Sequence, residues 1–526
     1  MAFILKNKHL FILAVICLGF FAIESLHSKQ YSYIEVDEIK SIMTSVGFDQ
    51  STINSVTKDS TFNQSYFLGE NNIQSVIRNN IVGESGNCIA YNLSLHMWLN
   101  IFDSSLYSAR MFSLLFGIGI IIVAFYLGIT LFDNKNLGLL ISLLIASSRS
   151  MMDYGILVRT YSMAIFFSLL ATLLYIKWIR SIELSSNTKL ITKKSIYYGI
   201  ISGISMLTHY FCLYILMIHA LFLIPHLLRR ETKNKIALFF PYVISAVVIT
   251  PWMLIGGLKG LSYMAGGNEW HLAYAKSSNP LASMTQLTSI QNTITYIKKI
   301  ALEWTYNGRY WDYFQFNIKM RYILIILVIP FIFLCVSLIN LLRKKSKDLF
   351  LLFSLFIIGP IFCIVLAFQS GHTVSFSDRY TLMSFPYFII IISYGIYQLQ
   401  SKSGLWRIVT LSLCTLFALN IIFQTKLQAD DVAKKFEPHF LRMNYSVQKQ
   451  LGVTKDLQSK IIEFPYIWVA LYFNFNFIPS QMEIKQRINP QLEKNKVYLF
   501  DTLTKKRIVL YELPKDFDAT PNYHAK

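Results

Sequence analysis

Two adjacent carboxylates, Asp37 and Glu38, follow the first hydrophobic segment of the chain. A carboxylate at the edge of a membrane can be reached from water and from lipid, and it can accept the proton of an attacking hydroxyl. The pair is therefore a candidate for general-base chemistry between a soluble and a lipid-borne substrate. The alternative is structural: Asp37 caps a helix that begins at Glu38, whose charge suits a first helical turn.

Further polar residues stand at the ends of later hydrophobic segments. Basic residues at the headgroup level can neutralise a phosphate and stabilise it as a leaving group. Taken singly, Arg159 and Arg379 could be snorkelling residues at helix ends, with their charged groups at the membrane interface. His209 could be a hydrogen-bonded core histidine. Their joint pattern favours transfer from a lipid phosphate. The polar residues at these ends are His96, Arg149, Asp153, Arg159, Tyr161, His209, Tyr210, His372, Asp378, Arg379 and Tyr380.

Composition places the chain in a membrane. It has 526 residues, of which 54% are hydrophobic and 15% charged, too few charges for a soluble surface of this size. Since a bilayer core needs about 20 apolar residues per helix, we expect a mainly α, polytopic protein with about 11 transmembrane helices. The segment 195–228 is either one broken span or two short ones. The expected spans are 9–26, 107–132, 136–152, 160–180, 195–209, 211–228, 236–256, 320–342, 348–369, 380–399 and 405–424.

Basic loops predict the orientation. Lysines and arginines cluster at 189–194, 229–235 and 343–347, and counting spans puts all three clusters on the side of the N terminus. The N terminus is then cytoplasmic. The first segment lacks a small-x-small cleavage site, so we expect a retained anchor in a multi-pass protein of the inner membrane. The formal charge of +20 follows from this orientation and does not indicate nucleic-acid binding.

Two long loops lie outside the cytoplasm in this topology. Hydrophobic residues repeat at helical spacing at both ends of loop 27–106, which is typical of amphipathic helices lying in the interface, and 49–87 is expected to be loop. Loop 257–319 is aromatic and polar and contains Glu269 and His271. Such a loop either carries binding residues or forms an interfacial aromatic belt.

The C-terminal tail has a soluble composition. Residues 430–450 are predicted to form a polar helix, and 497–500 and 508–511 two strands. We therefore divide the chain into a membrane domain, 1–424, and a small extracytoplasmic α/β domain, 425–526.

Five short motifs follow one another along the chain. They are Val36-Asp-Glu-Ile-Lys40, Tyr91-Asn-Leu-Ser-Leu-His-Met-Trp-Leu99, Leu157-Val-Arg-Thr-Tyr-Ser-Met163, Leu207-Thr-His-Tyr-Phe211 and Asp378-Arg-Tyr-Thr-Leu-Met-Ser-Phe-Pro386. In type and order they resemble motifs of the GT-C glycosyltransferases, in the branch with protein O-mannosyltransferases and the lipid A aminoarabinose transferase. One departure is Gly86-Asn-Cys-Ile-Ala90, where many relatives have a His-Pro-Pro-like turn.

The resemblance implies an inverting transferase that moves a sugar from a polyprenyl-phosphate donor to a glycan, lipid or protein acceptor. It implies that Asp37 is the catalytic base and that Glu38 orients substrate or acceptor. The donor phosphate would contact Lys40, Arg159 and Arg379. The residues implied for the sugar and acceptor pocket are His96, Tyr161, His209, Tyr210, Glu269, His271 and Tyr380.

A metal site and a different class of function are the remaining alternatives. Some relatives bind a divalent metal, but the spacing of Glu269, His271, His209 and His372 defines no site, so none is assigned. A polytopic transporter or lipid flippase would place its charges near span centres along a path. A non-enzymatic membrane assembly protein would have no reason to gather these residues on one interface.

Overall fold

The computed structural model describes residues 7–30, 36–48, 61–62, 71–102, 105–184, 188–228, 238–276, 285–305, 320–400, 404, 408, 460–464, 485–488, 493, 496–501 and 503–512. The chain divides into two compact units. Unit 1 consists of Met1–Glu24, Ser85–Tyr91 and Ser113–Ile421, and unit 2 of Ser25–Glu84, Asn92–Phe112 and Ile422–Lys526. The predicted boundary at 424 stays a prediction.

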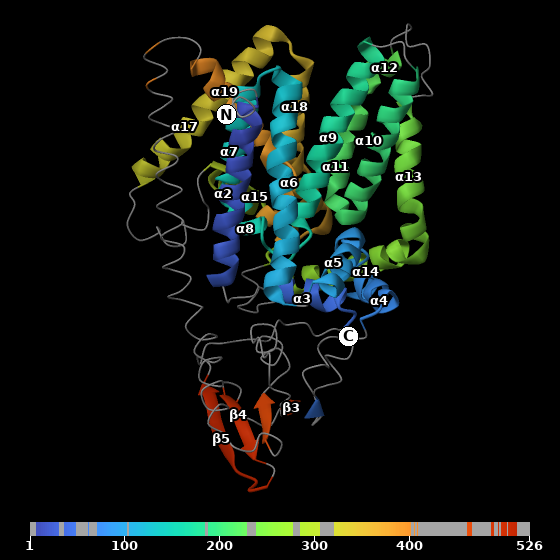
Figure 1. The fold of residues 1–526 in the computed structure, drawn as a ribbon, viewed down its shortest axis with the longest axis vertical. Helices are drawn as coiled ribbons and strands as arrows, with labels where there is room; N and C mark the ends of the chain where they lie inside the picture. Colours follow the sequence, from blue (N-terminus) through green and yellow to red (C-terminus); the bar gives the residue numbers. More distant parts are fainter. Residues whose placement is uncertain are drawn as a thin grey trace. The chain divides into compact units, whose positions relative to one another are not determined.

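The protein is a mainly helical, multi-pass membrane protein, as predicted (Figure 1). Within the described residues, six segments are long and apolar enough to cross a bilayer, against the roughly 11 expected from runs of about 20 apolar residues. They include helices α2 (Lys8–Gln30), α6 (Leu106–Phe132), α9 (Tyr161–Leu184) and α18 (Lys347–Ser370). The other two are Tyr210–Leu228 and Phe240–Lys276.

The remaining predicted spans agree with the structure to different degrees. Helices α10 (Thr188–Thr208), α17 (Met320–Lys344) and α19 (Phe385–Gln400) occupy three of them. The span predicted at 405–424, like the helix predicted at 430–450, lies outside the described residues. The span predicted at 136–152 is wrong in its length, because α7 (Lys135–Ala146) ends and a short helix, α8 (Arg149–Tyr154), follows.

Serine side chains explain the break between α7 and α8. The Ser147 hydroxyl donates to Leu143 O, and the Ser148 hydroxyl donates to Ile145 O, both at 2.7 Å. Ser148 also accepts from Met151 N as the N-cap of α8. Side-chain bonds of this kind compete with helix continuation and favour caps. Hydropathy alone does not detect them.

The segment 195–228 is two helical stretches separated at His209. After α10 the backbone is extended at His209, and a short 3₁₀ turn, η4 (Tyr210–Cys212), leads into α11 (Leu213–Leu221) and α12 (Ile224–Leu228). Loop 257–319 is largely helical in its described part. Helix α13 (Phe240–Trp252) continues through a π turn, η6 (Met253–Gly257), into α14 (Leu258–Lys276), and α15 (Ile290–Thr305) follows.

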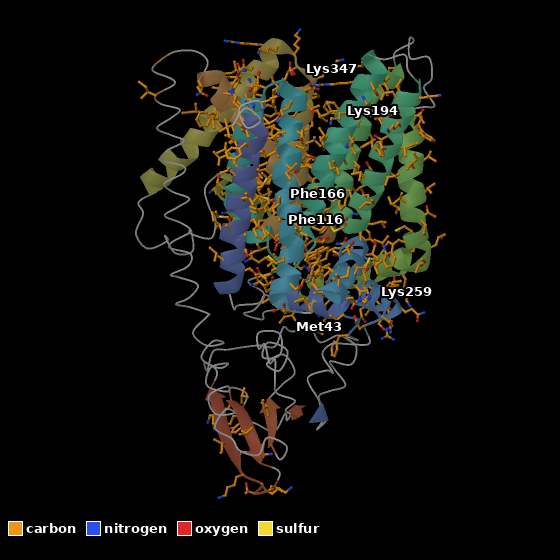
Figure 2. The ribbon with its side chains drawn as sticks, viewed as in Figure 1. Met43, Phe116, Phe166, Lys194, Lys259 and Lys347 are labelled. Carbon is orange, nitrogen blue, oxygen red and sulfur yellow. The ribbon has the colours of Figure 1, made fainter. Side chains whose placement is uncertain are left out.

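Small residues bring the helices of unit 1 close together. Gly199 and Gly203 are spaced as in a GxxxG motif on α10 and face α13: a Cβ at Gly203 would lie 2.7 Å from Val248 Cβ. The Ser245 hydroxyl donates to Gly199 O at 2.8 Å across this contact. Phe116 of α6 and Phe166 of α9 pack with ring centroids 5.7 Å apart (Figure 2). These contacts pack α10 against α13 and α6 against α9.

Unit 2 contains short helices and a sheet. The segment 27–106, predicted to be an external loop, contains α3 (Val36–Ser45), α4 (Ile73–Gly83) and α5 (Ile89–Ile101), most of which belongs to unit 2. Helix α4 falls in the stretch predicted to be loop, and it begins where Asn72 accepts from Ser75 N at 2.8 Å. Polar residues in 49–87 therefore include a helix cap as well as loop.

The tail forms most of a sheet with the order β1-β3-β2-β4-β5. Strands β2 and β3 are parallel, and the other neighbours are antiparallel. The two strands predicted at 497–500 and 508–511 are confirmed as β4 and β5. The strands are β1 (Thr61–Phe62), β2 (Lys460–Phe464), β3 (Lys485–Ile488), β4 (Lys496–Asp501) and β5 (Arg507–Glu512).

Candidate active site

The carboxylate pair lies on α3 of unit 2. Ile39, Ile42 and Met43 are at most 1% exposed and anchor the apolar face of this amphipathic helix. The helix begins at Val36, so Asp37 lies inside its first turn and not ahead of a helix that starts at Glu38. Asp37 is half-buried and Glu38 is buried. The two adjacent carboxylates thus have different surroundings.

Glu38 forms a bidentate ion pair with Arg110. Arg110 Nε donates to Glu38 Oε1 at 3.1 Å, and one of its terminal nitrogens donates to Oε2 at 2.8 Å. The residues are 0% and 3% exposed. A bidentate pair of this kind is strong and directional, and it fixes the first turn of α3. Sequence reasoning missed Arg110, although an arginine within a predicted span is a signal for a buried partner.

His96, on α5, holds the other end of α3. Its Nδ1 lies 2.8 Å from Ser45 O, and Asn100 Nδ2 donates to its Nε2 at 3.1 Å. Since Nε2 accepts, the proton is on Nδ1, which donates to the carbonyl. Both ring nitrogens of His96 are therefore engaged in hydrogen bonds within the protein. Lys40 is half-buried on α3. The implied roles of Lys40 and His96 toward donor and acceptor stay predictions.

Three chain segments meet around His209 in unit 1. The His209 ring centroid lies 6.1 Å from that of Tyr161, at the start of α9, and 6.4 Å from that of Tyr380. Tyr380 belongs to a short 3₁₀ turn, η9 (Asp378–Thr381), which also carries Arg379. Thr160 donates to Thr208 O at 2.6 Å and ties the first two segments together. The structure thus brings Arg159, Tyr161, His209, Arg379 and Tyr380 together, and their implied roles stay predictions.

His209 is a neutral hydrogen-bond donor at this position. It lies in the break between α10 and the span Tyr210–Leu228, and it is 3% exposed. Burial, together with the positive charges of Arg159 and Arg379, lowers the pKa of its imidazole to about 3. Its Nδ1 accepts from Phe211 N at 3.1 Å, which leaves the proton on Nε2.

Tyr210, unlike its neighbour His209, makes hydrogen bonds to the turn at Gly86 and Asn87. Its hydroxyl donates to Gly86 O at 2.6 Å, and its backbone N–H donates to Asn87 Oδ1 at 2.9 Å. Trp252 Nε1 donates to the same Gly86 carbonyl at 3.0 Å. Gly86 has φ +72°, and a Cβ at Gly260 would lie 2.5 Å from Gly86 N. Tyr210 therefore braces the Gly86–Ala90 turn that departs from the family's motif.

A second polar cluster adjoins these residues through Asp378 and was not predicted. Tyr154 donates to Asp378 Oδ2 at 2.6 Å, and the Tyr154 ring packs edge-on against Tyr161. Lys299 Nζ, on α15, lies 3.5 Å from Asp378 Oδ1 and 3.6 Å from Glu303 Oε1. The spacing of Lys299 and Glu303, one helical turn apart on an amphipathic stretch, was the available signal.

Glu303 is the most perturbed acid in this cluster. Burial and the nearby Asp378 charge raise the pKa of its carboxyl to about 8, although Lys299 acts in the opposite direction. Its Oε2 atom is buried and makes no hydrogen bond to the part of the chain that the structure describes. At neutral pH the Glu303 carboxyl is thus largely protonated and can donate a hydrogen bond.

Glu269, His271 and His372 do not join the His209 cluster through any contact seen between described residues. Glu269 is exposed on α14. The ring centroids of His271 and His372 lie 5.5 Å apart. Among the residues that the structure describes, no three His, Cys, Asp or Glu side chains are grouped to hold a metal ion, and we derive no metal-dependent step.

The overall fold is similar to known protein structures. AglB, an archaeal oligosaccharyltransferase from Archaeoglobus fulgidus solved with an inhibitory peptide and a dolichol-phosphate, aligns with 93% of this chain at 12% identity and a TM-score of 0.51. ArnT from Cupriavidus metallidurans, in the apo state, aligns with 90% of it at 10% identity and a TM-score of 0.50. The chain has a GT-C glycosyltransferase fold. It covers 62% of the AglB chain and 76% of the ArnT chain.

The GT-C fold confirms the resemblance stated from five short motifs. No family model matches the sequence, and no curated protein matches it. At 10–12% identity the alignments establish the fold alone. The roles of individual residues on this GT-C fold rest on the contacts described above.

Proposed function

We propose that this protein is a glycosyltransferase that moves a sugar from a polyprenyl-phosphate donor to an acceptor outside the cytoplasm. The observation that carries the proposal is that the neutral His209 imidazole lies beside Tyr161 and Tyr380, within the electrostatic reach of Arg159 and Arg379. Two guanidinium groups and an N–H donor form a set suited to an anionic phosphate. The AglB structure with a similar fold holds a dolichol-phosphate, which agrees with this assignment.

The reaction we propose is a single displacement. The acceptor oxygen forms a bond to the anomeric carbon while the bond from that carbon to the phosphate oxygen breaks. The polyprenyl phosphate leaves with the electron pair, and Arg159 and Arg379 stabilise its added negative charge. Attack from the side opposite the leaving group inverts the anomeric centre. His209 Nε2–H donates to a phosphate or sugar oxygen, and Tyr161 and Tyr380 pack against the sugar.

We assign the catalytic base to Asp37. It is the half-buried member of the carboxylate pair, whereas Glu38 is engaged by Arg110. Asp37 accepts the proton of the acceptor hydroxyl as attack proceeds. Glu38 contributes by fixing the first turn of α3, and Lys40 adds a positive charge on the same helix.

The orientation is part of the proposal. The basic clusters at 189–194 and 343–347 belong to one end of unit 1, where Lys194 and Lys347 lie (Figure 2). Basic loops favour the cytoplasm, so the opposite end, with His209, is assigned to the outside. Accessibility labelling at position 345 from the cytoplasm and at position 263 from the outside tests this, and the reverse pattern contradicts it.

The decisive experiment is transfer of sugar from a polyprenyl-phosphate donor by the purified chain. Asp37→Asn retains shape and hydrogen bonding but cannot act as a base, so turnover is expected to fall by about 10²–10⁴-fold with donor binding retained. Near-wild-type turnover in a folded Asp37→Asn protein contradicts the assignment. If the protein is instead a transporter or lipid flippase, reconstituted vesicles will translocate the lipid-linked sugar without forming a glycosylated product.

A further inference from the structure

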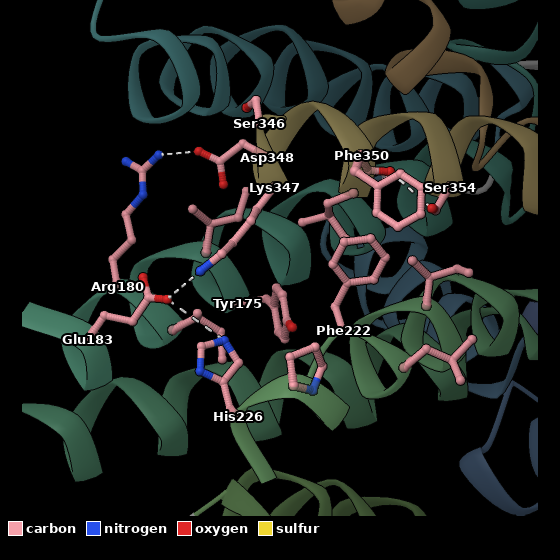
Figure 3. Close-up of a pocket in the computed structure, with 16 residues that line it drawn as sticks. Tyr175, Arg180, Glu183, Phe222, His226, Ser346, Lys347, Asp348, Phe350 and Ser354 are labelled. Carbon is pink, nitrogen blue, oxygen red and sulfur yellow. Dashed lines mark hydrogen bonds and ion pairs between the residues drawn. The ribbon is translucent and has the colours of Figure 1, made fainter. Parts of the chain in front are cut away.

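A cavity of about 670 Å³ lies at the other end of the same helices (Figure 3). Its walls come from the last turns of α9, from α11 and α12, and from the first turns of α18. Glu183 lies about 22 residues beyond Tyr161 on α9, which corresponds to roughly 33 Å at 1.5 Å per residue. On α18, Asp348 lies in the first turn, while His372 follows the last. The cavity is therefore separate from the His209 cluster.

The mouth of the cavity carries alternating charges. Arg180 donates to Asp348 Oδ2 at 2.7 Å, and Lys347 Nζ lies 3.4 Å from Glu183 Oε1. His226 Nε2 lies 3.9 Å from the same Glu183 oxygen. Figure 3 shows these pairs together on one side of the cavity. Two cations and two carboxylates thus share one polar rim, with no excess of either sign.

The ion pairs at the rim are partly exposed to solvent. The side chains of Arg180 and Asp348 are 36% and 35% exposed, and those of Lys347 and Glu183 are 67% and 32% exposed. Exposed pairs contribute little stability, so a ligand that offers equivalent partners can replace them at small cost.

The rest of the lining is apolar. Ile176, Ile218 and Leu351 are buried at its wall, and Phe222 lies beside them. Leu221 and Phe350 are 54% and 57% exposed where the cavity opens. Large apolar side chains exposed at the end of a membrane-length helix face acyl chains more favourably than water. An apolar body beneath a polar rim matches a lipid with its headgroup at the interface.

We propose that this cavity binds a phospholipid with a zwitterionic, primary-ammonium headgroup. The phosphate lies between Arg180 and Lys347, the ammonium lies between Glu183 and Asp348, and an acyl chain follows Phe222 and Leu351. A phosphate without an ammonium would take the two cations and leave two carboxylates next to its charge. A zwitterion replaces each broken pair with a new one. A trimethylated ammonium has no N–H group to donate a hydrogen bond to a carboxylate.

Lipid selectivity of the full chain tests this proposal. The protein, stripped of lipid in detergent, is titrated with phosphatidylethanolamine, phosphatidylcholine and phosphatidylglycerol of identical acyl chains, and bound lipid is counted by native mass spectrometry. Phosphatidylethanolamine is expected to bind about tenfold more tightly than either of the others, the scale of one charge-assisted hydrogen bond. Equal binding of the three lipids, or tighter binding of phosphatidylglycerol, overturns the proposal.

Two kinds of variant test the headgroup contacts and the apolar lining of the cavity separately. In Glu183→Gln combined with Asp348→Asn, the preference for ethanolamine over choline should disappear, while phosphatidylglycerol binding rises. Ser354→Phe places a ring in the cavity without altering a charge, and it should weaken binding of all three lipids. Asp133→Asn, an exposed acid outside the lining, is the matched control and should change nothing. An ethanolamine preference that survives the double substitution, or unchanged binding in Ser354→Phe, also overturns the proposal.

Discussion

Two regions of this molecule use partly or fully buried arginines in opposite ways. In unit 2, Arg110 and Glu38 form a bidentate pair in which each group satisfies the other. In unit 1, Arg159 and Arg379 both act on one neutral imidazole, that of His209. A bidentate pair gives stability and orientation, because each charge lies directly against its opposite. Two positive charges that act on one neutral imidazole favour an anion there, which is why we place the donor phosphate in unit 1.

The bidentate pair of Glu38 and Arg110 should give the largest effect. Glu38→Gln leaves the Arg110 charge buried without its carboxylate, and unfolding free energy should fall by about 3–5 kcal/mol. Denaturant or thermal unfolding in detergent measures it. Replacing both residues, Glu38→Gln with Arg110→Met, should recover much of the loss, since the buried charge is then gone. Asp37→Asn on the same helix is the control. A Glu38→Gln protein as stable as wild type would show that the pair does not hold α3.

The converging arginines should affect binding and leave stability nearly unchanged. Arg159→Ala or Arg379→Ala should weaken binding of a polyprenyl-phosphate donor by about 10–100-fold, the range for hydrogen bonds to a charged group. Lysine at either position should restore part of the affinity, because it keeps the charge but not the planar fork.

Arg343→Ala supplies the matched control for this measurement, since it removes an exposed guanidinium from the last turn of α17, away from both proposed lipid sites. Donor affinity in that variant should equal wild type. Equal losses in all three variants would mean that the effect comes from general charge or folding and not from the His209 cluster.

The Glu303 cluster differs from both regions, because Glu303 and Asp378 share one cation, Lys299. With its pKa raised from 4.5 to about 8, the folded state holds a proton that the unfolded state has lost. Its contribution to stability is therefore present below about pH 4.5 and declines as pH rises toward 8. Glu303→Gln mimics the protonated form. Compared with wild type, this variant should lose less stability between pH 6 and pH 9, by roughly 3 °C in thermal midpoint. Parallel pH profiles of the two proteins would contradict the shift.

The sequence predicts the parts of this molecule that depend on local pattern. Apolar runs locate the long helices, and short motifs select Arg159, His209 and Arg379, which the fold brings together. Pairings between distant residues are not visible in such patterns. Glu38 and Arg110 are 72 residues apart, and Arg110 falls inside an apparently ordinary span. Lys299 and Glu303 lie in a stretch whose aromatic composition concealed an amphipathic helix, α15.

Helix boundaries depend on side-chain hydrogen bonds, which a hydropathy average over many residues does not detect. Ser147 and Ser148 end α7 six residues before its predicted limit. Tyr210 and His209 stand side by side in one motif, yet Tyr210 braces the Gly86 turn while His209 faces Tyr161 and Tyr380. A motif gives the residue types that chemistry needs. Which of two neighbours carries the chemistry depends on contacts made by segments far away in the chain.

The smallest expected effect is the pH response of the converging cluster itself. A phosphodiester donor keeps one charge between pH 5.5 and pH 7.5, and a histidine with its pKa near 3 stays neutral over this range. Donor affinity should therefore change by less than about twofold, whereas a histidine titrating at its ordinary pKa of about 6.5 would add a charge and strengthen binding as pH falls. His209→Gln removes the imidazole and keeps a side chain that can donate and accept hydrogen bonds. Subtracting the pH profile of this variant from that of wild type isolates the histidine from Asp37 and Glu303. A difference that grows tenfold from pH 7.5 to pH 5.5 would mean that His209 takes up a proton beside two arginines, and the anion site would then have to be built on an imidazolium.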